Sequence, residues 1–97
     1  MMKDFFININ GSITKGPEAR ISVFDRGFLY GDSVYEATRT FNEKPFRLDK
    51  HLERLFLSAE KLDITPTFTK TQIEHQVKET IKHSQFKNAS LRIILSR

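Results

Sequence analysis

The chain has 97 residues, no cysteine and a formal net charge of +4. This length fits one small domain, and the lack of cysteine excludes both a disulfide framework and a thiolate metal site. Hydrophobic residues make up 38% and charged residues 29% of the chain, which indicates a soluble globular protein rather than a disordered one. Nine phenylalanines and no tryptophan predict a core rich in phenylalanine.

Charge and hydropathy also limit the expected partners. The 16 basic residues are spread along the chain among 12 acidic ones, without a dense basic block, so we expect no nucleic-acid partner. No apolar run approaches the ~20 residues that span a bilayer, and residues 1–4 do not resemble a signal peptide. We therefore expect a cytoplasmic protein without a membrane partner. The three histidines lack ligand-like spacing, so we expect no metal site.

The first elements read as short strands. Apolar residues 5–9 and 12–14 flank Asn10-Gly11, a strong signal for a tight hairpin because both turn positions require positive φ. A second turn follows at residues 15–18, and the alternation in residues 20–24 predicts a third strand.

The stretch 25–39 organises the rest of the chain. It begins as a loop in which Gly27 and Gly31 flank three bulky side chains, and we expect this loop to be fixed against another element. From Val34 the chain alternates as a strand that ends near residue 41, because strand side chains have a period of two.

One face of this strand presents a phenol, a small gap and a guanidinium, from Tyr35, Ala37 and Arg39. A fixed cation beside a phenol suits a small carboxylate. The alternative is a half-buried strand whose tyrosine and arginine extend to solvent, with Tyr30 of the preceding loop as a packing anchor. Glu36 points to the opposite face, where pairing at the edge of the core is expected rather than catalysis.

We predict a turn at residues 42–45 and a short returning strand at residues 46–48. The helix that follows is predicted to start at an Asp49 cap and to run to about residue 62. Its apolar positions recur with a helical period. His51, Arg54 and Ser58 form a polar strip beside them. Arg54 could bind a phosphate through its fork of donors; the alternative is a surface arginine that pairs with a nearby acid such as Glu53.

The final third predicts a second helix and a last strand. Thr69 and Gln72 form a capping-box pattern, and an apolar stripe continues to about Phe86. Residues 90–96 read as a β-branched-rich strand. This order favours an α+β domain in which two helices pack on an antiparallel sheet. Because the last strand runs to the final residue, we expect the chain to be part of something longer.

Two linked patterns carry a family resemblance. They are Asp25-Arg26-Gly27-Phe28-x-Tyr30-Gly31-Asp32-x-Val34-Tyr35-Glu36-x-x-Arg39 and Phe46-x-Leu48-x-x-His51-Leu52-x-Arg54-Leu55-x-x-Ser58-Ala59-x-x-Leu62. Together they resemble the amino-terminal part of the class IV (fold-type IV) aminotransferases, which depend on pyridoxal phosphate. The resemblance covers essentially residues 1–97 and implies that they form the small N-terminal domain of such an enzyme.

The resemblance implies a role for each matching residue. Arg54 matches the arginine that contacts the cofactor phosphate. Tyr35, Ala37 and Arg39 match strand residues that line the substrate pocket, and Tyr30 matches a loop tyrosine that reaches a partner subunit's site in branched-chain enzymes. None of the lysines matches the one that holds the cofactor, so no catalytic residue is expected in this chain. That lysine and most of the phosphate site belong to a C-terminal domain absent from this chain.

The implied activity is transfer of an amino group between an amino acid and a 2-oxo acid by a cytoplasmic homodimer, with branched-chain substrates favoured. The chain alone is expected to be inactive. D-amino acid transaminase and aminodeoxychorismate lyase are alternatives within the family. A stand-alone module that binds small anions without catalysis is an alternative of another class.

Overall fold

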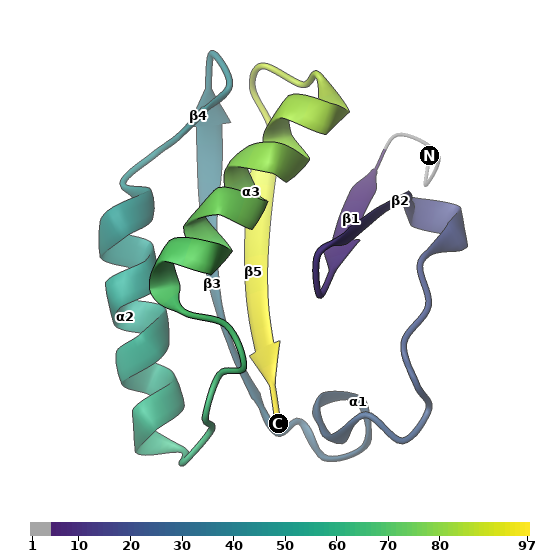
Figure 1. Cartoon of the computed structure of the whole chain (residues 1–97), viewed down its shortest axis with the longest axis vertical. Helices are drawn as coiled ribbons and strands as arrows, with labels where there is room; N and C mark the ends of the chain where they lie inside the picture. The colour runs from purple at the N-terminus through teal and green to yellow at the C-terminus, as the bar shows by residue number, and fades with distance from the viewer. Residues whose placement is uncertain (1–4) are drawn as a thin grey trace.

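A computed structural model of the chain describes residues 5–97; residues 1–4, on which the expectation of no signal peptide rests, lie outside this range. The elements in chain order are β1 (Phe6–Ile9), β2 (Ser12–Lys15), η2 (Gly16–Glu18), α1 (Arg26–Tyr30), β3 (Ser33–Phe41), β4 (Lys44–Pro45), α2 (Leu48–Lys61), α3 (Lys70–Ser84) and β5 (Ser90–Ser96). An antiparallel sheet of order β4-β3-β5 carries α2 and α3 on one face (Figure 1). The predicted α+β arrangement is confirmed.

The first hairpin forms as predicted but stands apart from the main sheet. Strands β1 and β2 pair with each other only, around a turn in which Asn10 has a φ of 52° and Gly11 a φ of 96°. The hairpin lies against α3 (Figure 1), where the Asn8 side-chain amide donates to Gln76 Oε1 at 3.0 Å and to Thr80 Oγ1 at 2.9 Å.

The predicted third strand at residues 20–24 is wrong. Its side chains alternate, but no strand pairs with this segment, and Ile21, Val23 and Phe24 are exposed. Ser22 folds the chain locally instead, because its hydroxyl accepts from Phe24 N at 3.0 Å and its carbonyl from Asp25 N at 3.0 Å. A serine that bonds its own neighbouring backbone competes with a sheet ladder.

Strands β3 and β5 form the longest pairing in the described chain. The register runs from Ser33 opposite Ser96 to Arg39 opposite Ser90. The returning strand β4 is only two residues long, shorter and earlier than the predicted segment at residues 46–48. It joins β3 through a tight turn in which Asn42 and Glu43 both have positive φ.

Helix α2 has the predicted length but a different start. The residue before it is Arg47, in the left-handed region with a φ of 52°, and no side chain caps the helix. Asp49 therefore lies inside the first turn, where its charge favours the positive end of the helix dipole. The predicted Asp49 cap is wrong.

Helix α3 begins as predicted and ends earlier. Thr69 Oγ1 accepts from Gln72 N at 3.1 Å, and Gln72 Oε1 accepts from Thr69 N at 2.8 Å, so the capping box is confirmed. The helix stops at Ser84 because Gln85 turns into the left-handed region with a φ of 64°, so Phe86 lies beyond it. No helix among residues 5–97 combines the length and apolarity that crossing a bilayer needs.

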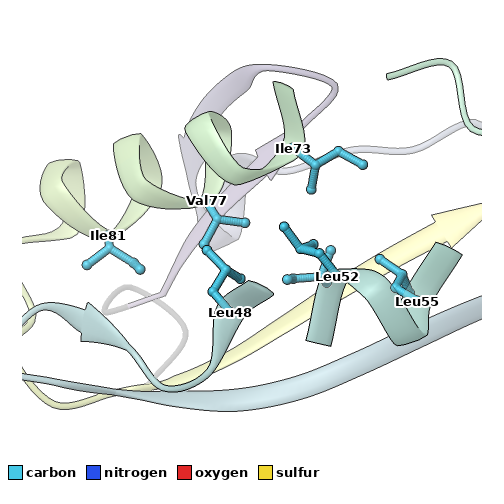
Figure 2. Close-up of a cluster of buried hydrophobic side chains, with 7 residues drawn as sticks. Leu48, Leu52, Leu55, Ile73, Val77 and Ile81 are labelled. Carbon is cyan, nitrogen blue, oxygen red and sulfur yellow. The ribbon is translucent and has the colours of Figure 1, made fainter. Parts of the chain in front are cut away.

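The core lies between the two helices and the inner face of the sheet. Figure 2 shows apolar side chains of α2 and α3 pointing toward one another across this space. The buried cluster contains Leu48, Leu52, Leu55, Ile73, Val77, Ile81 and Ile93. It holds no phenylalanine, so the predicted phenylalanine-rich core is wrong. Six of the nine phenylalanines are exposed in the described chain.

Candidate functional site

The outer face of the β3–β5 pair carries the polar side chains that the sequence singled out. We call this surface the open face; its residues are Tyr35, Ala37, Arg39, Ser90, Arg92 and Ile94. Opposed residues of an antiparallel pair point to one face, and the register places Ala37 opposite Arg92 and Tyr35 opposite Ile94. Tyr35 is 61% exposed and Ile94 58% exposed, so no described element covers them.

Two arginines flank the small side chain of Ala37. The Arg92 guanidinium lies 5.2 Å from the centre of the Tyr35 ring, a cation–π contact. Arg39 Nη1 donates to Ser90 Oγ at 3.3 Å, which orients the second guanidinium across the same strand pair. Residues 37–39 and 90–92 line a shallow depression of about 420 Å³ between these side chains. The face combines positive charge, a phenol and apolar surface around a gap.

Arg54 lies on the other face of β3, in a group that we call the Arg54 cluster (Glu36, His51 and Arg54). Arg54 Nε donates to Glu36 Oε2 at 2.9 Å and Nη2 donates to Glu36 Oε1 at 2.8 Å. His51 Nδ1 lies 2.7 Å from Glu36 Oε1. Glu36 is 8% exposed, whereas the Arg54 side chain is 68% exposed, so the arginine caps a buried carboxylate and still reaches solvent.

The charge state of Glu36 follows from these contacts. Hydrogen bonds from Arg54 hold the pKa of Glu36 below its usual value, against the effect of burial, and His51 acts in the same direction. The carboxylate in turn raises the pKa of Arg54. Because an ionised carboxylate only accepts, Nδ1 of His51 carries the proton in this contact. The expected pairing of Glu36 at the edge of the core is confirmed, and the alternative that pairs Arg54 with Glu53 is wrong.

The loop before β3 is a one-turn helix, α1, fixed against the end of β5. Asp25 caps it, because its Oδ2 accepts from Phe28 N at 3.1 Å and its Oδ1 from Ser96 Oγ at 3.0 Å. A Cβ on Gly27 would lie 2.8 Å from Ser96 Cβ, so only glycine fits there. Gly31 ends the helix with a φ of 66°. The predicted fixed loop with two structural glycines is confirmed.

A further contact joins this loop to helix α2. Arg97 pairs through Nε with Asp32 and donates through Nη1 and Nη2 to the carbonyls of Asp63 and Leu62, just beyond the helix. Hydrogen bonding from Arg97 lowers the pKa of Asp32, opposed by desolvation and helped by Arg26. Figure 1 shows the C-terminal end of β5 beside α1, where this contact forms.

The structure brings together some of the predicted site residues and separates others. Tyr35, Ala37 and Arg39 share the open face, while Arg54 is behind β3 on the helix side. Tyr30 is 70% exposed on α1, where the Arg26 guanidinium lies 5.2 Å from its ring. Within residues 5–97, no hydrogen bond or cation–π contact joins it to the other four.

The sequence prediction missed Arg92. It belongs to the open face only because β5 pairs with β3 in this register, a pairing between segments about fifty residues apart. Alternation within residues 90–96 puts Arg92 on one face but does not say which strand lies beside it.

The residues present fit part of a pyridoxal phosphate site. The solvent-facing guanidinium of Arg54 suits the phosphate, because arginine binds phosphate through its planar fork of donors. Among the described residues, no lysine lines the depression or belongs to the Arg54 cluster. These residues therefore suit the binding of the cofactor phosphate and of a carboxylate. They do not supply a lysine for the carbonyl group of the cofactor.

Comparison with known proteins identifies the family of this chain. Residues 33–97 match the family model of the class IV aminotransferases. The chain is 36% identical over 91 residues to a Methanocaldococcus jannaschii protein provisionally named a branched-chain-amino-acid aminotransferase, covering 94% of this chain and 32% of that protein. It is 36% identical over 90 residues to the aminodeoxychorismate lyase of Bacillus subtilis, covering 93% and 31%. D-alanine aminotransferases also match.

Solved structures share the fold. The branched-chain aminotransferase of the archaeon Thermoproteus uzoniensis, solved with norvaline, matches with a TM-score of 0.80 at 27% identity, over 90% of this chain and 31% of that one. A second branched-chain amino acid aminotransferase, solved with pyridoxamine 5'-phosphate, matches with a TM-score of 0.87 at 28% identity, over 99% and 33%. The chain thus spans about a third of the length of the relatives that it matches.

Fold and site together define a small α+β domain with two arginines on an exposed face of its sheet. The chain belongs to the class IV aminotransferases, and it corresponds to about a third of such an enzyme.

Proposed function

We propose that residues 1–97 are the small N-terminal domain of a pyridoxal phosphate-dependent aminotransferase that moves an amino group between an amino acid and a 2-oxo acid. The observation that carries this proposal is the open face, where Arg39 and Arg92 flank Ala37 beside Tyr35. Two guanidinium groups beside a phenol suit the carboxylate that amino acids and 2-oxo acids share.

In this proposal the Arg54 cluster serves the cofactor and the open face serves the substrate. Arg54 offers its outward N–H groups to the phosphate of the cofactor. When bound, pyridoxal phosphate supplies the electron sink on which amino transfer depends, while the protein binds and orients the reacting groups. Arg39 and Arg92 bind the carboxylate and thereby orient the substrate, and the ring of Tyr35 lies beside Arg92 on the same face.

A branched aliphatic substrate is the favoured choice. The exposed Ile94 and the ring of Tyr35 are apolar surfaces beside the small Ala37, which suits an aliphatic side chain of moderate size. D-amino acid transamination and aminodeoxychorismate lysis are the alternatives, because matched relatives with these names share the same third of the fold.

We also propose a homodimer in which Tyr30 reaches the partner subunit's site. The exposed apolar side chains of Ile21, Val23, Phe24 and Phe28 around α1 support an interface there. A cytoplasmic location remains a prediction from the sequence.

The experiment that tests the function is amino transfer by the full-length gene product that carries this chain. The purified protein is incubated with 2-oxoglutarate and, in separate reactions, L-leucine, L-isoleucine, L-valine or D-alanine, and the new 2-oxo acid is measured. We expect the branched-chain L-amino acids to react fastest. Faster reaction of D-alanine would favour the D-amino acid alternative. A protein that retains the cofactor and transfers no amino group would contradict the proposal, unless it releases pyruvate from aminodeoxychorismate.

A further inference from the structure

The Arg54 guanidinium has two hydrogen-bonding edges, and only one of them is used within the described chain. Its Nε and Nη2 groups form a bidentate pair with the Glu36 carboxylate at 2.9 and 2.8 Å. A guanidinium carries five N–H groups in a fixed plane. The pair with Glu36 therefore leaves three N–H groups, of which one on Nη1 and one on Nη2 form the Nη1–Nη2 edge, and no residue among 5–97 accepts from Nη1.

Glu36 is held firmly enough to orient this arginine. It sits on the inner face of β3, is 8% exposed, and its Oε1 atom also contacts His51 Nδ1 at 2.7 Å. His51 and Arg54 are three residues apart on α2, so they project from the same side of the helix toward β3. The Glu36 carboxylate, which extends from β3, is thus held by two side chains of α2, His51 and Arg54.

We propose that Glu36, supported by His51, is a positioning residue that fixes Arg54 so that its Nη1–Nη2 edge is ready for the cofactor phosphate. This inference rests on the proposed function, because it takes the phosphate as the ligand of Arg54. A long arginine side chain on an exposed helix face samples many rotamers, and ordering it opposes anion binding. The bidentate pair removes part of that cost before the phosphate arrives.

A competing electrostatic effect makes the inference testable. The negative charge of Glu36 partly neutralises Arg54, so removing that charge would strengthen the attraction for an anion if charge were the dominant effect. Positioning predicts weaker phosphate binding in Glu36→Gln, and charge compensation predicts stronger binding. The amide introduced by Glu36→Gln would also turn its NH₂ group, a donor, toward either Nε or Nη2 of Arg54, which are donors themselves. The bidentate pair with Arg54 therefore cannot persist in this variant.

The test separates phosphate recognition from general damage by comparing two probes. Dissociation constants of pyridoxal 5'-phosphate and of pyridoxal, which lacks the phosphate, are measured by absorbance on cofactor-free full-length protein. The dissociation constant of pyridoxal divided by that of pyridoxal 5'-phosphate, here called the phosphate preference or the ratio, isolates the contribution of the phosphate contacts and falls when those contacts are lost. We expect Glu36→Gln to weaken pyridoxal phosphate binding by about tenfold, the scale of one charged hydrogen bond, and to leave pyridoxal binding nearly unchanged. A merely structural role would weaken both probes equally and would overturn the inference.

Matched variants complete the design. Glu53→Gln makes the same charge change on an exposed neighbour of Arg54, and we expect it to leave the ratio at the wild-type value. In an Arg54→Ala background, Glu36→Gln should change the ratio no further, because no arginine remains to be positioned. If Glu36→Gln does not fold, His51→Phe keeps a ring and removes the donor to Glu36, and a smaller fall in the ratio is expected; an unchanged ratio would then overturn the inference.

The outcomes distinguish the two levels of the proposal. If Arg54→Ala leaves the ratio unchanged, Arg54 does not bind the phosphate, and both the assigned role and this inference fail. If Arg54→Ala lowers phosphate preference strongly while Glu36→Gln leaves it unchanged or raises it, the role of Arg54 stands and the positioning role of Glu36 is wrong.

Discussion

The two faces of strand β3 differ in almost every physical respect. On the helix side, Glu36 and Thr40 are buried and hydrogen-bonded, and the packing continues into the leucines of α2. On the other side, Tyr35 and Arg39 are exposed beside Arg92 and Ile94. Strand β3 thus separates the buried core from a face that no described element covers. The helix side of β3 therefore contributes buried packing, whereas the open face leaves its side chains exposed to solvent.

The largest expected effect on stability comes from the helix side. Leu52 is 1% exposed at the centre of the core, so Leu52→Ala should lower the free energy of unfolding by about 2–5 kcal/mol through lost burial and a cavity. Ile94→Ala on the open face is the matched control and should cost less than about 1 kcal/mol in a protein whose face is covered only by solvent. Urea unfolding of both variants checks this. A cost for Ile94→Ala equal to that for Leu52→Ala would mean that the open face is covered in the full-length protein.

Arg92→Ala should show the reverse pattern. Removing a charged donor from the proposed substrate site should lower kcat/KM by about 10–100-fold, the kinetic equivalent of about 1.5–3 kcal/mol. The unfolding free energy should hardly change, because Arg92 is exposed and its side chain makes a cation–π contact with an exposed Tyr35. Arg92→Lys keeps the charge without the fork and should recover part of the loss. Wild-type kinetics in Arg92→Ala would remove this residue from the proposed substrate site.

A smaller effect concerns the pH dependence of stability. Because the folded protein holds the pKa of Glu36 below its unfolded value of about 4.3, the stabilisation is fully present above that value. It is lost as the pH falls through the folded pKa. Glu36→Gln should therefore be less stable than wild type near neutral pH, and the difference should shrink in acid. Urea unfolding across the range from neutral to acidic pH measures it; a difference independent of pH would contradict the ion-pair assignment.

The features that the sequence predicts well are local ones. Asn10-Gly11 defines its turn because both residues must adopt positive φ, and Thr69 with Gln72 defines a helix start within four residues. The position of Glu36 on the face opposite Tyr35 follows from strand alternation alone. In each case the determining contacts lie within one element, so no knowledge of the tertiary fold is required.

The features that the sequence does not predict depend on distant partners. Residues 20–24 alternate like a strand but find no strand to pair with. The partner of Arg54 is Glu36, eighteen positions earlier and on another element, rather than an acid of its own helix. Arg92 joins the open face through the β3–β5 register. The exposure of most phenylalanines is likewise not predicted, because a count of residue types does not say which face of an element each side chain occupies.

The central claim is that this chain is part of a pyridoxal phosphate enzyme whose cofactor lysine lies elsewhere. The most direct test is the intact mass of the full-length gene product before and after borohydride reduction, followed by peptide mapping. Reduction fixes the cofactor covalently to its lysine. The account predicts a gain equal to the reduced cofactor, retained after denaturation, on a lysine outside residues 1–97. No gain in mass, or a label on a lysine within these residues, would contradict it.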